Sequence, residues 1–341
     1  STSKSSGAAG ENSFFITAAS NPKEEERSGV VAIKSKNNKS YEIKVTQDPN
    51  AGIMQLTVAA NEVLYTTVFD TQIKLYKESG FGGNLISHSY DVEKGYGSIR
   101  FDNYVTSIPS KAFKDCTTLE SIYLPEGVTY IAPDAFEGCT NLKYIISPNS
   151  DNYTMFVYNN QVMAVPPAQT NFIVPEGVTS IVSGVFTGTK VESVILPSTL
   201  QDIAASAFEG CTSLKSVTIN SAECLIREKA FYRCSALQSL MFNVDANNYH
   251  ISYNIGTSAF ENCSLSYLEF PGHVSLDDYA FQNGVKGSTG SGKNRFGGAT
   301  VKFLGEFSLG TNVFNGCSIE KIDIADADSW VFQSFETLAS N

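Results

Sequence analysis

The sequence lacks long hydrophobic runs: in its 341 residues, the apolar stretches, such as residues 191–197, are short and interrupted by polar residues. A membrane-spanning helix needs about 20 consecutive apolar residues, so the sequence predicts no bilayer-spanning segment. Histidine is also rare, and His88, His250 and His273 are scattered. The seven cysteines form no close Cys-x-x-Cys pair. Zinc sites need such clustered ligands, so we expect no metal site and no cofactor.

Positive charge is scarce as well. The net charge is -11, and from residue 101 onward 13 Lys and Arg stand against 24 Asp and Glu. An acidic surface repels phosphate backbones, which argues against nucleic-acid binding. The composition, 42% hydrophobic and 17% charged, is nevertheless that of a folded chain.

What the sequence does have is an internal repeat. Ala-Phe-x-x-Cys occurs at residues 112–116, 135–139, 207–211, 230–234 and 259–263, with a Val-Phe variant at 313–317 and copies without cysteine at 185–186 and 280–281. Six of the seven cysteines occupy this one position, and the basic period is 22 to 23 residues. A Leu-x-x-Ile-x-Leu segment follows, as in Leu119, Ile122 and Leu124, which is leucine-rich-repeat spacing.

One such unit cannot bury its own apolar face, but stacked units form a continuous core. Prolines such as Pro125 and Pro197 end the strands, and Val-x-x-Ile segments, such as residues 105–108, form the next side of each turn. We therefore predict an α/β leucine-rich-repeat solenoid, right-handed and made mostly of short parallel strands, with a small all-β module before it.

Two long spacings indicate insertions. A spacing of 50 residues follows Phe136, and within it residues 153–158 and 161–165 flank Asn159-Asn160, which predicts a hairpin. A spacing of 33 residues follows Phe281 and contains the Gly- and Ser-rich residues 287–294. Residues 287–293 match Gly-x-x-x-x-Gly-Lys, but Asn294 replaces the Ser or Thr of a phosphate-binding loop, so we interpret the segment as flexible chain.

The predicted organisation has five parts. These are a flexible tether at 1–12, a partial β module at 13–49, a β-rich N-terminal cap at 50–96, the repeats at 97–325 and a C-terminal cap at 326–341. Strand-like runs at 14–19, 29–35 and 41–47 define the β module. Terminal repeats need a cap, and Trp330, Phe332 and Phe335 are the candidates at the C-terminal end.

The unit at residues 112–125 resembles the BspA-like leucine-rich repeats of bacterial and protozoan surface proteins, and residues 61–67 resemble the segment that precedes these repeats in Bacteroidetes proteins. Asn21, Arg27, Val31-x-Ile33 and Ile43-x-Val45-x-Gln47 look like the back half of a BACON domain. The resemblance to BspA-like repeats implies a secreted or lipid-anchored outer-membrane surface protein that adheres to host matrix proteins or other cells. The resemblance to BACON modules implies binding to mucin glycans. Membrane attachment would then depend on a lipid anchor that this chain lacks.

In such a solenoid, the residues between inward-facing strand positions line the concave face, where repeat proteins bind extended partners. The central row is Tyr123, Ile146, Ile195, Thr218, Met241, Glu269, Lys302 and Asp323, and its neighbour is Ser121, Tyr144, Ser193, Ser216, Ser239, Tyr267, Thr300 and Lys321. The aromatic and apolar first half suits a protein or glycan contact, and cross-strand packing that stiffens the sheet is the alternative interpretation. Alternating charge at Glu269, Lys302 and Asp323 predicts an ion ladder, with paired hydrolase carboxylates as the other possibility.

The cysteines beside the repeated Phe are expected to be buried free thiols. No Gly-x-Ser-x-Gly and no nucleophile with its base can be placed together, so we expect a protein that is not an enzyme. The leading hypothesis is a monomeric, adhesin-like cell-surface protein that presents the concave face to a host or neighbouring-cell protein. The alternative is a glycan-binding surface lipoprotein that captures mucin or polysaccharide.

Overall fold

A computed structural model describes residues 56, 58–149, 154–244, 250–286 and 299–324, together with four strands nearer the N-terminus. The chain divides into two compact units, Ser1–Leu56 and Thr57–Asn341. In the first unit β1 (Thr2–Ser3) pairs antiparallel with β2 (Phe15–Ile16), and β3 (Arg27–Lys34) with β4 (Ser40–Gln47). The proposed cap residues Trp330, Phe332 and Phe335 and the loop at 287–294 lie outside the described residues.

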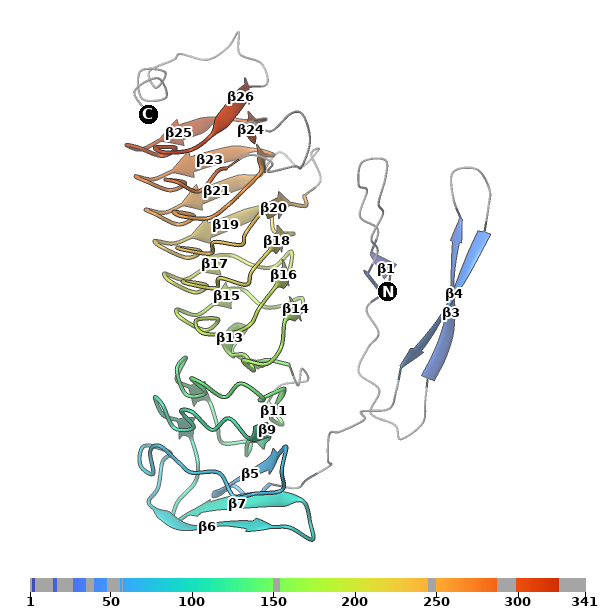
Figure 1. Ribbon diagram of the computed structural model, residues 1–341, viewed down its shortest axis with the longest axis vertical. Coiled ribbons are helices and arrows are strands. Elements are labelled where there is room, and N and C mark those ends of the chain that lie inside the picture. Colours follow the sequence, from blue (N-terminus) through green and yellow to red (C-terminus); the bar gives the residue numbers. More distant parts are fainter. Residues whose placement is uncertain are drawn as a thin grey trace. The chain divides into compact units, whose positions relative to one another are not determined.

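The second unit is a solenoid of stacked parallel strands (Figure 1). One sheet has seven strands: β14 (Asn171–Ile173), β16 (Ser193–Leu196), β18 (Ser216–Ile219), β20 (Ser239–Phe242), β22 (Tyr267–Phe270), β24 (Ala299–Phe303) and β26 (Ile319–Ile324). The other has eight: β12 (Phe156–Tyr158), β13 (Gln161–Ala164), β15 (Ser180–Ile181), β17 (Asp202–Ile203), β19 (Glu223–Ile226), β21 (Ser252–Ile255), β23 (His273–Leu276) and β25 (Phe307–Leu309). The predicted solenoid of short parallel strands is confirmed.

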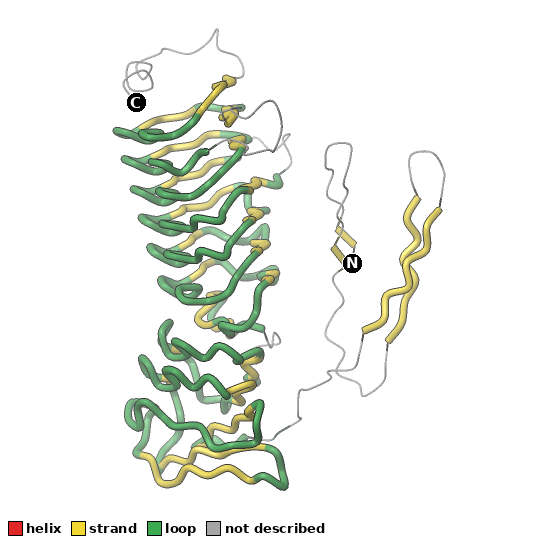
Figure 2. The backbone as a smooth tube through the Cα atoms, in the orientation of Figure 1, coloured by secondary structure: helices red, strands yellow, loops and turns green. Residues whose placement is uncertain are grey.

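The helical part of the α/β prediction is not confirmed, because the described residues contain no helix (Figure 2). We call each Ala-Phe-x-x-Cys segment an arm, together with the variant copies at residues 185–186, 280–281 and 313–317, and each arm is a series of turns. In most arms the residue before Ala and the residue before Cys have positive φ, as at Ser206 (58°) and Gly210 (71°) in one arm and at Lys229 (56°) and Arg233 (59°) in the next. A right-handed helix requires negative φ throughout, so these positions interrupt it. The fold class is a β-solenoid.

The arms stack through their backbones. The amide of Phe208 donates to the carbonyl of Ala230 at 2.8 Å, and that of Phe231 donates to Ala259 at 2.8 Å. The cysteine adds a bond in the opposite direction, since the Cys234 thiol donates to the carbonyl of Phe208, one turn earlier, at 3.1 Å. These bonds satisfy polar backbone groups that would otherwise be buried without partners.

All seven cysteines are free thiols, as predicted, and all but Cys317 are buried. Burial raises the pKa of Cys116 to about 11 and the pKa values of Cys224 and Cys263 to about 12. The thiolate is the reactive species, so these groups are poor nucleophiles at neutral pH.

We therefore expect the native protein to react with a thiol reagent such as Ellman's reagent at pH 8 through at most one group, Cys317. Unfolding in guanidinium should expose all seven thiols. The number of thiols released within minutes, with and without denaturant, is the measurement. Rapid native reaction of two or more cysteines would contradict this account of their burial.

The phenylalanine rings of the arms form the centre of the core. The rings of Phe186, Phe208, Phe231 and Phe260 stack with successive centroid distances of 4.2, 4.7 and 4.9 Å. Most buried residues from Met155 onward form one cluster, and most of those from Val63 to Ile145, with Phe156 and Ala164, form a second. The two clusters meet at the predicted hairpin, which is confirmed: β12 and β13 are antiparallel, and Asn159 and Asn160 have φ of 48° and 60°.

A mixed five-stranded sheet begins the second unit. Its order is β11 (Tyr144–Ile146), β9 (Leu119–Tyr123), β5 (Glu62–Thr67), β7 (Tyr96–Phe101) and β6 (Leu85–Asp91), and the first turns also contain β8 (Ser107–Ile108) and β10 (Tyr130–Ile131). Because β5 pairs antiparallel with β9, it covers the backbone edge that the first repeat would otherwise leave open. Tyr65 of β5 lies opposite Gly97 of β7, which leaves room for its ring.

Candidate functional site

The outward face of the seven-stranded sheet is the candidate binding site, and the strand register places its side chains in two rows. In the central row, Ile195 lies beside Thr218, and Thr218 lies beside Met241. The same row continues from Glu269 through Lys302 to Asp323. In the neighbouring row Ser193, Ser216, Ser239, Tyr267, Thr300 and Lys321 follow one another. Residues from six turns, spread over more than 120 positions of sequence, are therefore brought onto one surface.

The first turn does not contribute to this surface, which corrects the sequence-based assignment. Ser121 and Tyr123 are buried, although Tyr144 and Ile146 beside them on β11 are half-buried. On the antiparallel partner β5, Leu64 lies opposite Tyr123 and is buried as well. At the N-terminal end of the solenoid, the expected first residues of the two rows are therefore buried and are not available to a partner. The sequence pattern treated β9 as the first strand of an open face, whereas β5 packs beside it.

The sequence analysis also missed one strand. Ile173 of β14 lies beside Ile195 in the central row, and Asn171 lies beside Ser193 in the neighbouring row. The segment Ile173-Val-Pro175 has the same form as Ile195-Leu-Pro197, so the signal was present, but no arm precedes it to mark the repeat. No hydrogen-bonded pairing joins β11 to β14, so the Tyr144 and Ile146 positions belong to the five-stranded sheet.

Three apolar side chains are exposed on this face: Ile173 is 44% exposed, Met241 50% and Tyr267 46%. The outward face of the eight-stranded sheet differs in composition. Its corresponding row is Ser180, Asp202, Leu225, Asn254, Ser275 and Ser308, in which only Leu225 is apolar. Exposed apolar side chains on one sheet, of which Met241 and Tyr267 lie on adjacent strands, and a polar surface on the other sheet distinguish the two faces. Apolar side chains gathered on one exposed face mark a candidate interaction site.

The C-terminal end of the face is charged. Lys302 Nζ lies 3.5 Å from Glu269 Oε2, and Lys321 Nζ lies 3.1 Å from Asp323 Oδ2. Tyr267 donates a hydrogen bond to Glu269, and burial together with this carboxylate raises the pKa of Tyr267 to about 12. Because Lys302 stands between Glu269 and Asp323 in the row, the two carboxylates do not form the shared cleft that a paired-carboxylate hydrolase needs.

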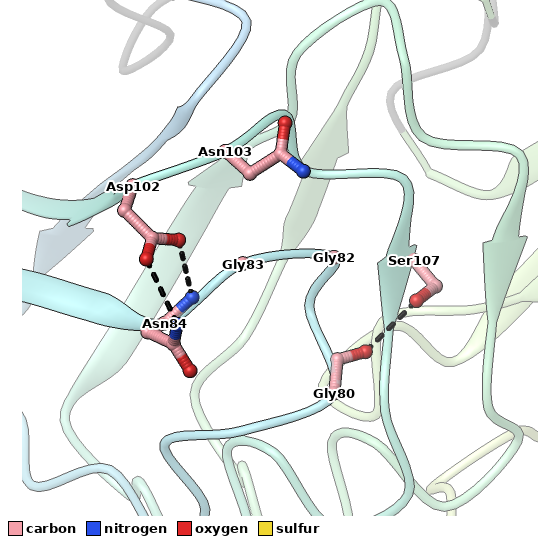
Figure 3. Close-up of a pocket in the computed structure, with 7 residues that line it drawn as sticks. All are labelled: Gly80, Gly82, Gly83, Asn84, Asp102, Asn103 and Ser107. Carbon is pink, nitrogen blue, oxygen red and sulfur yellow. Dashed lines mark hydrogen bonds between the residues drawn. The ribbon is translucent and has the colours of Figure 1, made fainter.

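Apart from the sheet face, a recess near the N-terminal end of the solenoid is a second candidate site (Figure 3). It is an open cavity of about 700 Å³ lined by Gly80, Gly82, Gly83, Asn84, Asp102, Asn103 and Ser107. The carboxylate of Asp102 accepts hydrogen bonds from the backbone amide of Asn84 at 2.7 Å and from its side-chain amide at 2.8 Å. Amide and carboxylate groups of this kind can exchange hydrogen bonds with a hydroxyl-rich ligand.

Among the described residues, no group of three or more His, Cys, Asp or Glu side chains comes together as a possible metal site. The same residues include no helix that is long and apolar enough to cross a membrane.

The stacked turns and the open sheet face define a repeat solenoid of the leucine-rich type. The model of the BspA type leucine-rich repeat region matches residues 88–162 and 166–286 in six copies. The chain belongs to this family. The model of the BACON domain matches residues 1–48. No curated protein matches the chain.

Among solved structures, the chain is similar to a leucine-rich repeat protein from Eubacterium ventriosum (17% identity, TM-score 0.39, covering 68% of this chain and 66% of that one). It is also similar to a leucine-rich repeat protein from Bacteroides ovatus (14% identity, TM-score 0.37, covering 75% and 76%). A third similar structure is a leucine-rich cell surface protein from Faecalibacterium prausnitzii (16% identity, TM-score 0.36, covering 71% and 62%).

Proposed function

We propose that this protein is a non-enzymatic, adhesin-like binding protein of the cell surface, and that the outward face of the seven-stranded sheet binds a host or neighbouring-cell protein. The observation that carries the proposal is the set of exposed apolar side chains Ile173, Met241 and Tyr267 on that face, against the polar face of the other sheet. Family membership supports the surface location, because the repeats of this chain are of the BspA type and resemble the repeats of bacterial surface proteins.

The charged end of the face complements the apolar part. Apolar and aromatic side chains are enriched at the centres of protein interfaces, and charged groups at their rims. Here Met241 and Tyr267 lie on adjacent strands, and the pairs formed by Glu269 with Lys302 and by Lys321 with Asp323 follow on the next turns. A partner with a compact apolar contact and an adjoining patch of both charges fits this surface.

Glycan binding is the second candidate, and the cavity in Figure 3 is the observation that favours it. Its lining offers the amides of Asn84 and Asn103 and the carboxylate of Asp102. The glycan would then bind the N-terminal end of the solenoid and leave the sheet face for another role.

The two candidate functions predict different binding results on paired arrays, one of extracellular-matrix proteins and one of mucin or polysaccharide glycans. We expect a protein to bind. For that partner, the triple variant Ile173→Ser, Met241→Ser, Tyr267→Ser should lower the affinity by at least about 30-fold, because buried apolar anchors dominate interface energies. Surface plasmon resonance with the immobilised partner is the measurement.

The matched control is Leu225→Ser, Asn254→Ser, His273→Ser on the eight-stranded sheet, which should change the affinity less than about two-fold. Equal losses from both triple variants would remove the assignment to the seven-stranded sheet. Glycan binding that is lost with Asn103→Ala would assign the function to the cavity in Figure 3.

A further inference from the structure

One turn of the solenoid lacks its arm. Phe136 and Phe186 are 50 residues apart, about two repeats, and in the turn between them residues 165–170 connect β13 directly to β14. A cavity of about 520 Å³ occupies this place. Its lining includes Asp134 and Phe136 of the preceding arm, Val185 and Thr187 of the following arm, and Val165 and Pro167 of the connection. We call this cavity the arm gap, and its volume is within the range of about 300–1,000 Å³ that is common for ligand sites.

The two walls of the arm gap carry unpaired backbone groups. Where arms stack regularly, the amides of Phe208 and Gly210 each donate to the next turn at 2.8 Å. At the gap the equivalent amides of Phe136 and Gly138 have no acceptor among the described residues.

On the facing wall, the carbonyls of Val185 and Thr187 occupy the positions that accept such bonds elsewhere, and no described residue donates to them. One wall therefore offers donors and the other offers acceptors. This is the arrangement that a single added segment of extended backbone would satisfy from both sides.

The floor and rim restrict the side chains of such a segment. Phe136, Val165 and Val185 are apolar and nearly buried, so the floor suits one apolar side chain. At the rim, Glu137 is paired with Lys114 at 2.7 Å. Asp134 accepts a hydrogen bond from Ser110 at 2.8 Å but has no cationic partner in the described part of the chain. A lysine or arginine beside the apolar residue would supply that partner.

We propose that the arm gap binds an extended segment of a partner polypeptide, with one apolar side chain flanked by Lys or Arg, which takes the place of the missing arm. The recognition is strand addition between two arms rather than binding on the sheet face. It is a second interaction site, independent of the proposed adhesin face.

The test uses the full chain and a set of fluorescein-labelled heptapeptides with blocked ends, a lysine at each end, serines between, and Val, Ile, Leu, Met or Phe at the centre. At least one peptide should bind with a stoichiometry of one, measured by fluorescence anisotropy. Its binding should slow hydrogen exchange of the Phe136 and Gly138 amides by at least about ten-fold, because both gain acceptors. N-methylation of its central amides should weaken binding by at least about ten-fold.

Two matched variants locate the site. Thr187→Trp fills the gap and should weaken peptide binding by at least about ten-fold. Glu209→Trp places the same ring at the equivalent position of the next arm, where no gap exists, and should leave binding unchanged. The triple variant of the sheet face should also bind the peptide normally, which separates this proposal from the proposed function.

Three results would overturn the proposal: no peptide of the set binds at millimolar concentration, the N-methylated peptide binds equally well, or Glu209→Trp weakens binding as much as Thr187→Trp.

Discussion

Replacement of Phe231 by alanine is expected to lower the free energy of unfolding by about 3–5 kcal/mol. The Phe231 side chain is fully buried, and its ring lies 4.7 Å from that of Phe208 and 4.9 Å from that of Phe260, with interplanar angles of 9° and 6°. Removing the ring leaves a cavity between two neighbours that cannot close it, because backbone hydrogen bonds fix the spacing of the arms.

The effect should be large because the stability of a repeat protein is approximately a sum of contacts between nearest neighbours, and this one ring contributes to two of them. Urea unfolding followed by circular dichroism measures the change. The control is Phe69→Ala, since Phe69 is 71% exposed and should cost less than about 0.5 kcal/mol. A loss below about 1 kcal/mol for Phe231→Ala would mean that the ring stack is not the main support of these turns.

Substitution of Gly97 by alanine is expected to destabilise the N-terminal end of the solenoid by about 1–3 kcal/mol. A methyl group at Gly97 would overlap the ring of Tyr65, its cross-strand neighbour. The ring cannot move aside easily, because Tyr65 is fully buried and its hydroxyl is hydrogen-bonded to His88 Nε2 at 2.8 Å. Overpacking of this kind forces side chains away from their rotamers or shifts strands.

Hydrogen exchange in β5, β6 and β7 should therefore accelerate in Gly97→Ala, while exchange in β18 and β20 stays unchanged. Ser87→Ala on β6 is the control, because the Ser87 side chain is exposed. In a Tyr65→Leu background the alanine at position 97 should cost much less, so a double-mutant cycle measures the clash directly. Additive effects of the two substitutions would show that the ring is not what excludes the methyl group.

The regular spacing of Phe, Cys and Leu made much of the fold predictable. A solenoid repeats its environment once per turn, so residues 22 or 23 positions apart fall into the same row whatever lies between them. That is why the pairing of Ser193 with Ser216, and of Thr218 with Met241, could be read from spacing alone. The hairpin at Asn159-Asn160 was predictable for a local reason, since asparagine tolerates positive φ.

Other features had no local signal. The arms contain Lys229 and Arg233 at positive φ, where the sequence shows no glycine, so helical turns were a reasonable expectation. Backbone bonds from neighbouring arms hold those residues in that conformation. Similarly, the degenerate turn that contains β14 lacks an arm, so the exposure of Ile173 was not predicted.

By itself, the sequence determined the repeat, its period, the inward set of Phe, Cys and Leu residues and the order of the outward rows, because one apolar pattern recurs in each turn and can be buried only by stacking. The tertiary structure alone decided where those rows are open. Tyr123 is buried at the end where β5 pairs with β9, and Met241 and Tyr267 are exposed further along. The arm gap likewise exists only where two arms face each other across a turn that has no arm. The exposure of a side chain and the pairing of a backbone group depend on neighbours that are distant in sequence, so a local residue pattern does not predict them.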